Sequence, residues 1–141
     1  METKSSALFS ELLGDNLSKV DDLDDYKKVN KAKFDEVSSL TDQKIKATTD
    51  AADKFEQASK LKLNEKFKEY LGVKVQEFRK RIEADKLVSP IIKLFVDAKE
   101  VDTWNKGIRE YNTKTAAIVK EADDLGKKAD QIVKDNPTVI K

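Results

Sequence analysis

The fold of this chain is decided by residues 101–132, which read VDTWNKGIREYNTKTAAIVKEADDLGKKADQI. A seven-residue repeat runs through them, with an apolar residue or threonine at each a and d position; we call these ten residues the heptad stripe. The a positions are Val101, Ile108, Thr115, Ala122 and Ala129, and the d positions are Trp104, Tyr111, Ile118, Leu125 and Ile132. Alternating steps of three and four residues keep them on one face of an α-helix. The stretch therefore predicts a long helix that packs along one face against other helices.

The heptad stripe could lie inside the protein or against a second copy of it. Val119 and Val133 occupy e positions and widen the apolar face beyond a and d. A wider face is typical of a helix that contacts two neighbours in a bundle. We therefore expect a monomer with the stripe, including Trp104, in its own core. A homodimer through the stripe is the alternative.

Length and charge limit the classes of function. The chain has 141 residues, and 28 Lys and Arg against 27 Asp and Glu leave a net charge of +1. One domain of this size buries a substantial core, and a near-zero charge balance gives no electrostatic basis for binding nucleic acid. We expect a single folded domain with no nucleic-acid partner.

Two residue types are missing from the sequence. It has no Cys and no His, which removes the thiolate nucleophile, the commonest general base and the commonest transition-metal ligands. No apolar run reaches the roughly 20 residues of a membrane-spanning helix. We expect no catalytic residue, no cofactor, no metal site and no transmembrane segment.

The helix boundaries follow from capping and breaking residues. Gly14 predicts the end of a short first helix, and Asp15 or Asn16 predicts the cap of a second. Ser89-Pro90 suits a helix start, with Ser89 as the cap and Pro90 at the first helical position. Asn136-Pro137 predicts a stop. The expected helices span residues 6–13, 15–38, 42–87 and 90–135, followed by a tail at 136–141.

Two of these boundaries had competing interpretations. The hydroxyl-rich segment 38–42 favours a break, with Thr41 and Asp42 at the next helix start. The apolar spacing then persists across Gly72, which predicts a helix that continues through this glycine, straight or bent. The alternative is one helix from Asp24 to Leu71 that ends at Gly72.

Together these elements predict an all-α protein. Two long helices joined by a short link become antiparallel neighbours. We expect an elongated antiparallel three-helix bundle with long coiled-coil-like helices and a short N-terminal helix.

Two groups of residues are candidate partner contacts. The first is the apolar face of the short N-terminal segment, formed by Leu8, Phe9, Leu12 and Leu13. It can close one end of the bundle, or insert into a partner's groove or a membrane surface. The second group is Arg79 and Arg81, which can meet an acidic partner or form part of a charged outer face.

These features favour a non-enzymatic helical interaction or scaffold protein that binds another protein. The mixed, nearly neutral surface of Lys with Asp and Glu is typical of an exposed helical rod, and we expect an exported cell-surface or envelope protein of the lipoprotein kind. One alternative is a cytosolic adaptor, chaperone or assembly factor. The other is an amphipathic lipid-binding bundle, although polar residues such as Thr48, Ser59 and Thr115 interrupt the apolar faces.

Overall fold

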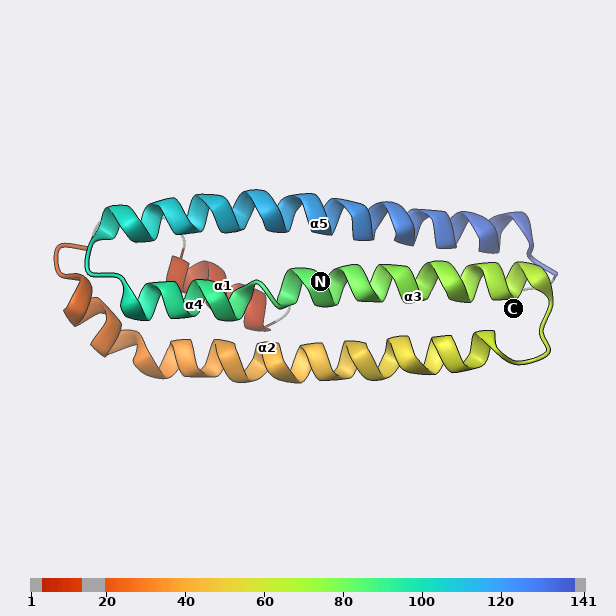
Figure 1. Ribbon diagram of the computed structural model, residues 1–141, viewed down its shortest axis with the longest axis horizontal. Helices are drawn as coiled ribbons and strands as arrows, with labels where there is room; N and C mark the ends of the chain where they lie inside the picture. Colours follow the sequence, from red (N-terminus) through yellow and green to blue (C-terminus); the bar gives the residue numbers. More distant parts are fainter. Residues whose placement is uncertain (1–3, 14–19, 139–141) are drawn as a thin grey trace. The chain divides into compact units, whose positions relative to one another are not determined.

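The computed structural model describes residues 4–13 and 20–138, and these residues form helices and connecting segments without a strand. The helices are α1 (Lys4–Leu13), α2 (Leu23–Ser59), α3 (Glu65–Asp85), α4 (Val88–Asp97) and α5 (Val101–Asp135) (Figure 1). The predicted all-α helical bundle with a short N-terminal helix is confirmed.

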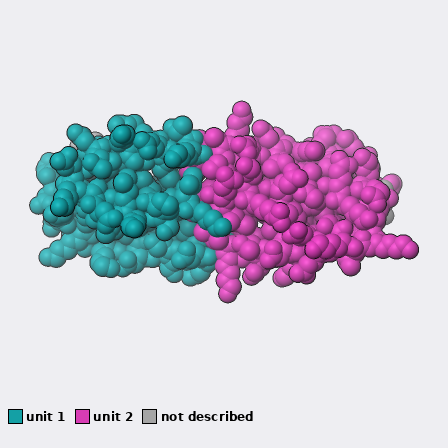
Figure 2. Space-filling model, viewed as in Figure 1, with its two compact units in different colours: residues 1–44, 86–114 teal, residues 45–85, 115–141 magenta. Residues whose placement is uncertain are grey.

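The chain divides into two compact units (Figure 2). Unit 1 consists of residues 1–44 and 86–114, and unit 2 consists of residues 45–85 and 115–141. Unit 1 thus holds α1, α4 and the first parts of α2 and α5. Unit 2 holds α3 and the remaining parts of α2 and α5. The expectation of a single domain stays a prediction.

Unit 1 has an aromatic core. Phe95 and Trp104 have no exposed surface, and their ring centroids lie 3.7 Å apart. The Phe34 ring of α2 also packs on Phe95, with ring centroids 4.4 Å apart, and Tyr26 meets Phe95 edge-on at 5.9 Å. Large rings bury much apolar surface at little conformational cost, so this cluster joins α2, α4 and α5.

A break at residues 98–100 makes the contact between Phe95 and Trp104 possible. Residues nine apart in a continuous α-helix point about 180° away from each other. The chain instead leaves the helix after Asp97 and re-enters it at Val101, and α4 and α5 lie side by side in opposite directions (Figure 1). The predicted single helix 90–135 is therefore wrong, because burial of both rings outweighs the helix propensity of Ala98, Lys99 and Glu100.

Unit 2 packs three helical segments on smaller side chains. Its buried cluster consists of Val73, Ala129 and Ile132, with Leu125 and Val133 partly buried against it. Ala122 and Ala129 have no exposed surface. Phe67 and Tyr70 also pack against this cluster, so the buried apolar side chains of the unit are aliphatic and its aromatic rings are only partly buried.

The chain turns at residues 60–64, between α2 and α3, so the predicted helix 42–87 is also wrong. Asn64 accepts a hydrogen bond on Oδ1 from the backbone N–H of Lys66 at 2.8 Å. At the other end, Ser59 donates its hydroxyl to the carbonyl oxygen of Glu56 at 2.7 Å. Asn at an N-cap satisfies N–H groups that have no partner within the helix, and this signal was overlooked in the sequence.

The start of α2 also differs from the prediction of a helix over residues 15–38. Asp22 caps the helix, since its Oδ1 accepts from the N–H groups of Asp24 and Asp25 at 3.0 and 3.1 Å. Val20 and Asp21 precede the helix. The proposed caps Asp15 and Asn16 lie outside the described residues.

The predicted break at 38–42 does not occur. Thr41 is buried and follows Phe34 and Val37 at helical spacing, so it extends the packed face of α2 instead of capping a new helix. The hydroxyl-rich segment misled the prediction because a buried position in a packed helix outweighs the weak preference of Ser and Thr for caps.

The remaining boundaries lie close to the predicted positions. α3 ends at Asp85 and passes through Gly72, so the alternative helix ending at residue 71 is wrong. α4 begins one residue before Ser89, and its N-cap is Leu87 without a side-chain hydrogen bond, so the cap assigned to Ser89 is wrong. Pro90 is the third residue of α4, where its missing N–H removes no intrahelical bond.

The C-terminal stop of α5 is where Asn136-Pro137 predicts it. Asn136 donates its side-chain amide to the carbonyl oxygen of Ile132 at 2.9 Å, just after the last helical residue, Asp135. The described part of the tail, residues 136–138, is not helical, and the rest of the predicted tail lies outside the described residues.

The heptad stripe lies against the rest of the chain. Each of its ten residues is buried or partly buried, whereas Val119 at an e position is 36% exposed. The stripe thus contributes to the cores of both units. The monomeric state stays a prediction.

Candidate functional site

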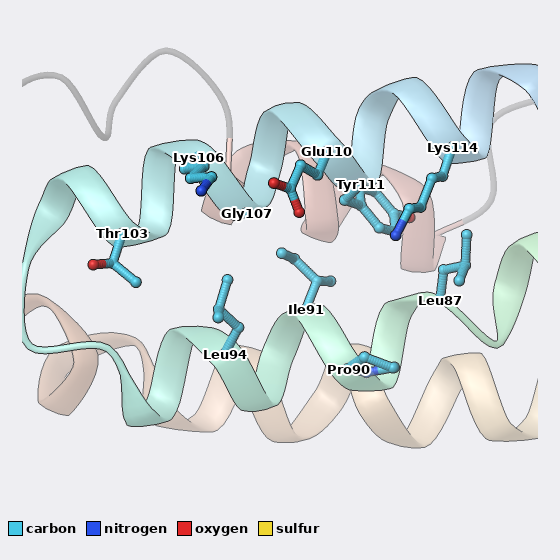
Figure 3. Close-up of a pocket in the computed structure, with 10 residues that line it drawn as sticks. All are labelled: Leu87, Pro90, Ile91, Leu94, Thr103, Lys106, Gly107, Glu110, Tyr111 and Lys114. Atoms are coloured by element: carbon cyan, nitrogen blue, oxygen red, sulfur yellow. The ribbon is translucent and has the colours of Figure 1, made fainter.

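Unit 1 contains a surface pocket of about 370 Å³ between α4 and α5 (Figure 3). Four of its lining residues come from α4 and the residue before it, and six come from α5. They are Leu87, Pro90, Ile91 and Leu94 on one side, and Thr103, Lys106, Gly107, Glu110, Tyr111 and Lys114 on the other. Ile91 and Leu94 point from α4 toward α5 in Figure 3. We call this feature the α4–α5 pocket.

The lining residues recur at helical spacing on both helices. Steps of three and four residues place each set on one face of its helix. On α5 the set runs from Thr103 to Lys114, which corresponds to about 16 Å along the helix axis. The pocket is therefore a short groove that follows the two helices, not a round cavity.

Gly107 allows the two helices to approach here. A Cβ atom at this position would lie 2.0 Å from Cδ2 of Leu94 and 3.5 Å from Cδ1 of Ile91. Leu94 thus occupies the space that any other residue at 107 would need. Ile91 is 5% exposed and belongs to the aromatic core cluster, so the groove rests on the core of the unit.

Charged side chains lie along the α5 side of this groove. Lys106, Glu110 and Lys114 are exposed and follow one another at four-residue steps. Among the residues that the structure describes, none of the three forms an ion pair or a side-chain hydrogen bond. The groove therefore combines an apolar base with three unpaired charges in the order plus, minus, plus.

The N-terminal candidates Leu8, Phe9, Leu12 and Leu13 pack inside unit 1. Leu12 is 1% exposed, and the other three pack against the aromatic core cluster. The Phe9 ring lies 5.1 Å from that of Tyr111. These contacts place the apolar face of α1 against its own unit.

Polar contacts add to the docking of α1. The hydroxyl of Tyr26 donates to the carbonyl oxygen of Leu12 at 2.8 Å, and Lys33 pairs with Glu11 at 2.5 Å. Burial raises the pKa of Tyr26; the positive charge of Lys33 lowers it to a smaller extent, and the negative charge of Glu11 raises it. The hydrogen bond and ion pair of Glu11 raise the pKa of Lys33.

The two arginine candidates lie in unit 2 and form ion pairs with different acidic residues. Arg79 is exposed and pairs with Glu56 at 2.8 Å. Arg81 pairs with Glu77 at 2.9 Å and with Asp123 at 3.2 Å. The N-terminal group belongs to unit 1, so the two candidate groups lie in different units and are separate features.

Glu77 is the centre of a charged cluster in unit 2. Glu77 is 5% exposed. Its carboxylate accepts hydrogen bonds from Lys74 at 2.6 Å and from Arg81 at 2.9 and 3.0 Å. Burial by itself raises the pKa of Glu77, but the hydrogen bonds and positive charges of Lys74 and Arg81 outweigh burial and lower it. The same carboxylate lies close to α5, since a Cβ at Gly126 would be 3.3 Å from Glu77 Oε1.

Neither a metal-binding cluster nor a membrane-spanning helix is found among residues 4–13 and 20–138. These residues contain no group of three or more acidic side chains placed to hold a metal ion. None of their helices combines the length and the apolarity that a bilayer crossing requires.

Comparison with protein-family models, curated proteins and solved structures gives no match for this chain. The site therefore has to be interpreted from its own geometry.

The sequence predictions missed the α4–α5 pocket. Apart from Leu87, the last residue of the predicted helix 42–87, its residues were assigned to the single predicted helix 90–135, in which Leu94 and Gly107 would be thirteen positions apart. The available signal was Gly107, at the g position between the stripe residues Trp104 and Ile108, because a glycine inside a helical pattern can have a packing role.

Proposed function

We propose that this chain is a non-enzymatic helical scaffold that binds another protein, and that the α4–α5 pocket of unit 1 receives an apolar side chain of that partner. The observation that carries this proposal is the groove itself, with an apolar base of Ile91 and Leu94, where Leu94 packs closely against Gly107. Protein interfaces concentrate their binding energy in a few apolar anchors that fill such pockets.

The base of the groove supports the same proposal. Ile91 packs in the aromatic core cluster with Phe95 and Trp104, so the apolar base is held in place before a partner arrives. A preformed pocket lowers the entropic cost of association. This is the setting in which one apolar side chain contributes strongly to affinity.

The proposal also includes a location. We favour an exported protein at a cell surface or envelope, because the exposed faces mix lysines with acidic residues at a net charge of +1. Treatment of intact source cells with a protease tests this: an exposed protein is cleaved, whereas a protein degraded only after lysis contradicts the location.

The binding proposal is tested by selection from a random library of displayed helical peptides against the full-length chain. Selected peptides should share a large apolar residue and should bind less tightly to Thr103→Phe, which fills the groove from its exposed edge. The expected loss is at least about tenfold, the scale of one good anchor.

Thr113→Phe is the matched control. It places the same ring on the exposed side of α5 at a position that does not line the groove. The affinity of the selected peptides for this variant should lie within about twofold of their affinity for the wild type. This change is much smaller than the roughly tenfold loss expected for Thr103→Phe. Circular dichroism should show equal helicity in both variants. Failure to select any binding peptide, or equal binding by Thr103→Phe and wild type, would contradict the proposed function.

A further inference from the structure

The charges beside the groove specify what kind of partner it fits. Lys106, Glu110 and Lys114 lie on one face of α5 and extend over about 12 Å of helix. All three are exposed, and none has a partner among the described residues. An unpaired row of charges beside an apolar base has the layout of a seam between two helices, in which flanking charges select the partner.

The groove suits a helix better than an extended strand or a loop. Its lining residues recur with helical spacing on two antiparallel helices of unit 1, so its apolar base runs parallel to α4 and α5 (Figure 3). A helix laid in this groove would meet Leu94 and Ile91 with residues spaced three or four apart.

From this geometry we infer that the α4–α5 pocket binds an amphipathic helix of another protein that carries an acidic, a basic and an acidic residue at four-residue steps beside its apolar anchor. This inference rests on the proposed function and names the chemistry of the partner. The two acidic residues lie against Lys106 and Lys114, and the basic residue lies against Glu110.

Helix α5 of a second copy does not satisfy the same pattern when it lies in register with α5 of the first. If α5 of one molecule lay against α5 of another in register, each lysine would oppose a lysine and Glu110 would oppose Glu110. Like charges placed opposite each other across an interface are unfavourable. The pattern therefore disfavours an in-register α5–α5 dimer, and the proposal commits to a helix of another protein.

Three synthetic peptides test this inference. Each has about 15 residues, roughly four helical turns, and the same leucine anchors, and they differ only in the flanking row: Glu-Lys-Glu, Lys-Glu-Lys or Gln-Gln-Gln. Fluorescence anisotropy with labelled peptides and the full-length chain should give the order Glu-Lys-Glu, then Gln-Gln-Gln, then Lys-Glu-Lys. Three exposed pairs predict a difference of about tenfold between the first and the last at low salt, and added salt should reduce it.

Charge reversal of the protein is the second arm. The triple variant Lys106→Glu, Glu110→Lys and Lys114→Glu should invert the order of the peptides. Lys93→Glu, which changes an exposed lysine of α4 outside the groove lining, should preserve it. Circular dichroism should confirm that both variants remain helical.

The outcomes separate this inference from the proposed function. Equal affinity of the three peptides, together with weaker binding of all three to Thr103→Phe, would overturn the charge pattern and leave the apolar pocket in place. Absence of binding by every peptide up to millimolar concentration would overturn both. A preference that persists in the triple variant would place the peptide on another surface and would contradict both as well.

Discussion

Unit 1 and unit 2 share the helices α2 and α5, but their interiors are filled differently. Unit 1 packs Phe34, Phe95 and Trp104 against one another and has a groove on its surface. Unit 2 packs Val73, Ala129 and Ile132 and holds the buried carboxylate of Glu77. The comparison teaches that the same two helices contribute to two kinds of core, one centred on buried aromatic rings and one on buried aliphatic side chains beside a buried carboxylate.

The largest expected effect comes from the aromatic core. Trp104→Ala should lower the free energy of unfolding by about 3–5 kcal/mol, because it leaves a large cavity beside Phe95. Urea denaturation followed by circular dichroism measures this change.

Trp104→Phe is the conservative control for that variant. The indole Nε1 of Trp104 is buried without a hydrogen-bond partner among the described residues. Phenylalanine removes this unpaired donor and keeps one ring, so the loss should be about half as large or smaller. Equal losses for both substitutions would show that the Phe95 contact is not the source of the stability of unit 1.

The buried charge of unit 2 should give the next largest effect. Glu77→Ala removes the acceptor of Lys74 and Arg81, and the loss of these charge-assisted bonds should lower the free energy of unfolding by about 1–3 kcal/mol. The value stays below that of Trp104→Ala because both freed cations reach water, with side-chain exposures of 21% and 39%. A loss larger than that of Trp104→Ala would contradict the prediction that the aromatic core of unit 1 contributes more to the free energy of unfolding than the buried carboxylate of unit 2.

The same carboxylate should make unit 2 sensitive to acid. The pKa of Glu77 is lowered from its ordinary value of 4.5, so the unfolded chain binds a proton more readily than the folded one. Its stabilising contribution is therefore complete above pH 4.5 and is lost as the pH falls through the lower folded value. Urea denaturation across this range should show a smaller acid-induced loss in Glu77→Gln than in the wild type; identical profiles would contradict the role of Glu77.

The helix glycines Gly72 and Gly107 should give smaller changes in stability, and these changes should differ between the two units. A Cβ at Gly72 in unit 2 meets nothing within 4 Å, so Gly72→Ala should raise the free energy of unfolding by about 0.5–1 kcal/mol through helix propensity alone. Gly107→Ala in unit 1 has the same propensity gain, but Leu94 must move to make room. Thermal denaturation should therefore give opposite signs for the two substitutions, and a gain in stability for Gly107→Ala would show that Leu94 relocates without cost.

The smallest effect is expected at the exposed charges. Arg79→Ala breaks an ion pair with Glu56 whose two side chains are 60% and 41% exposed, and such pairs contribute about 0.5 kcal/mol or less. Urea denaturation should place this variant within error of the wild type. A loss above about 1 kcal/mol would exceed what an exposed pair supplies.

Helical periodicity and helix-breaking residues made part of this structure predictable. The heptad stripe correctly predicted a helix whose apolar face turns inward, since a repeat of three and four residues leaves one buried face in any helical packing, and Asn136-Pro137 correctly predicted its end at Asp135. The clearest chain break near Pro90 was also found. The turns at 60–64 and 98–100 were missed, because neither contains glycine or proline.

The candidate site was harder to predict than the fold. Leu12 was recognised as part of an apolar face, but its burial against unit 1 required knowledge of where Tyr26 and Phe95 lie. The α4–α5 pocket depends on residues that are close only because the chain reverses at 98–100.

The sequence by itself determined that the protein is helical, because the spacing of its apolar residues is a local property that any folded state must bury. The tertiary structure alone decided where the helices stop and which faces meet. Phe95 and Trp104 show the reason: the residues between them favour a helix, but only a reversal of the chain brings both rings into one core. The free energy of that burial depends on residues distant in sequence, so no local pattern encodes it. The groove beside Gly107 is a consequence of the same reversal.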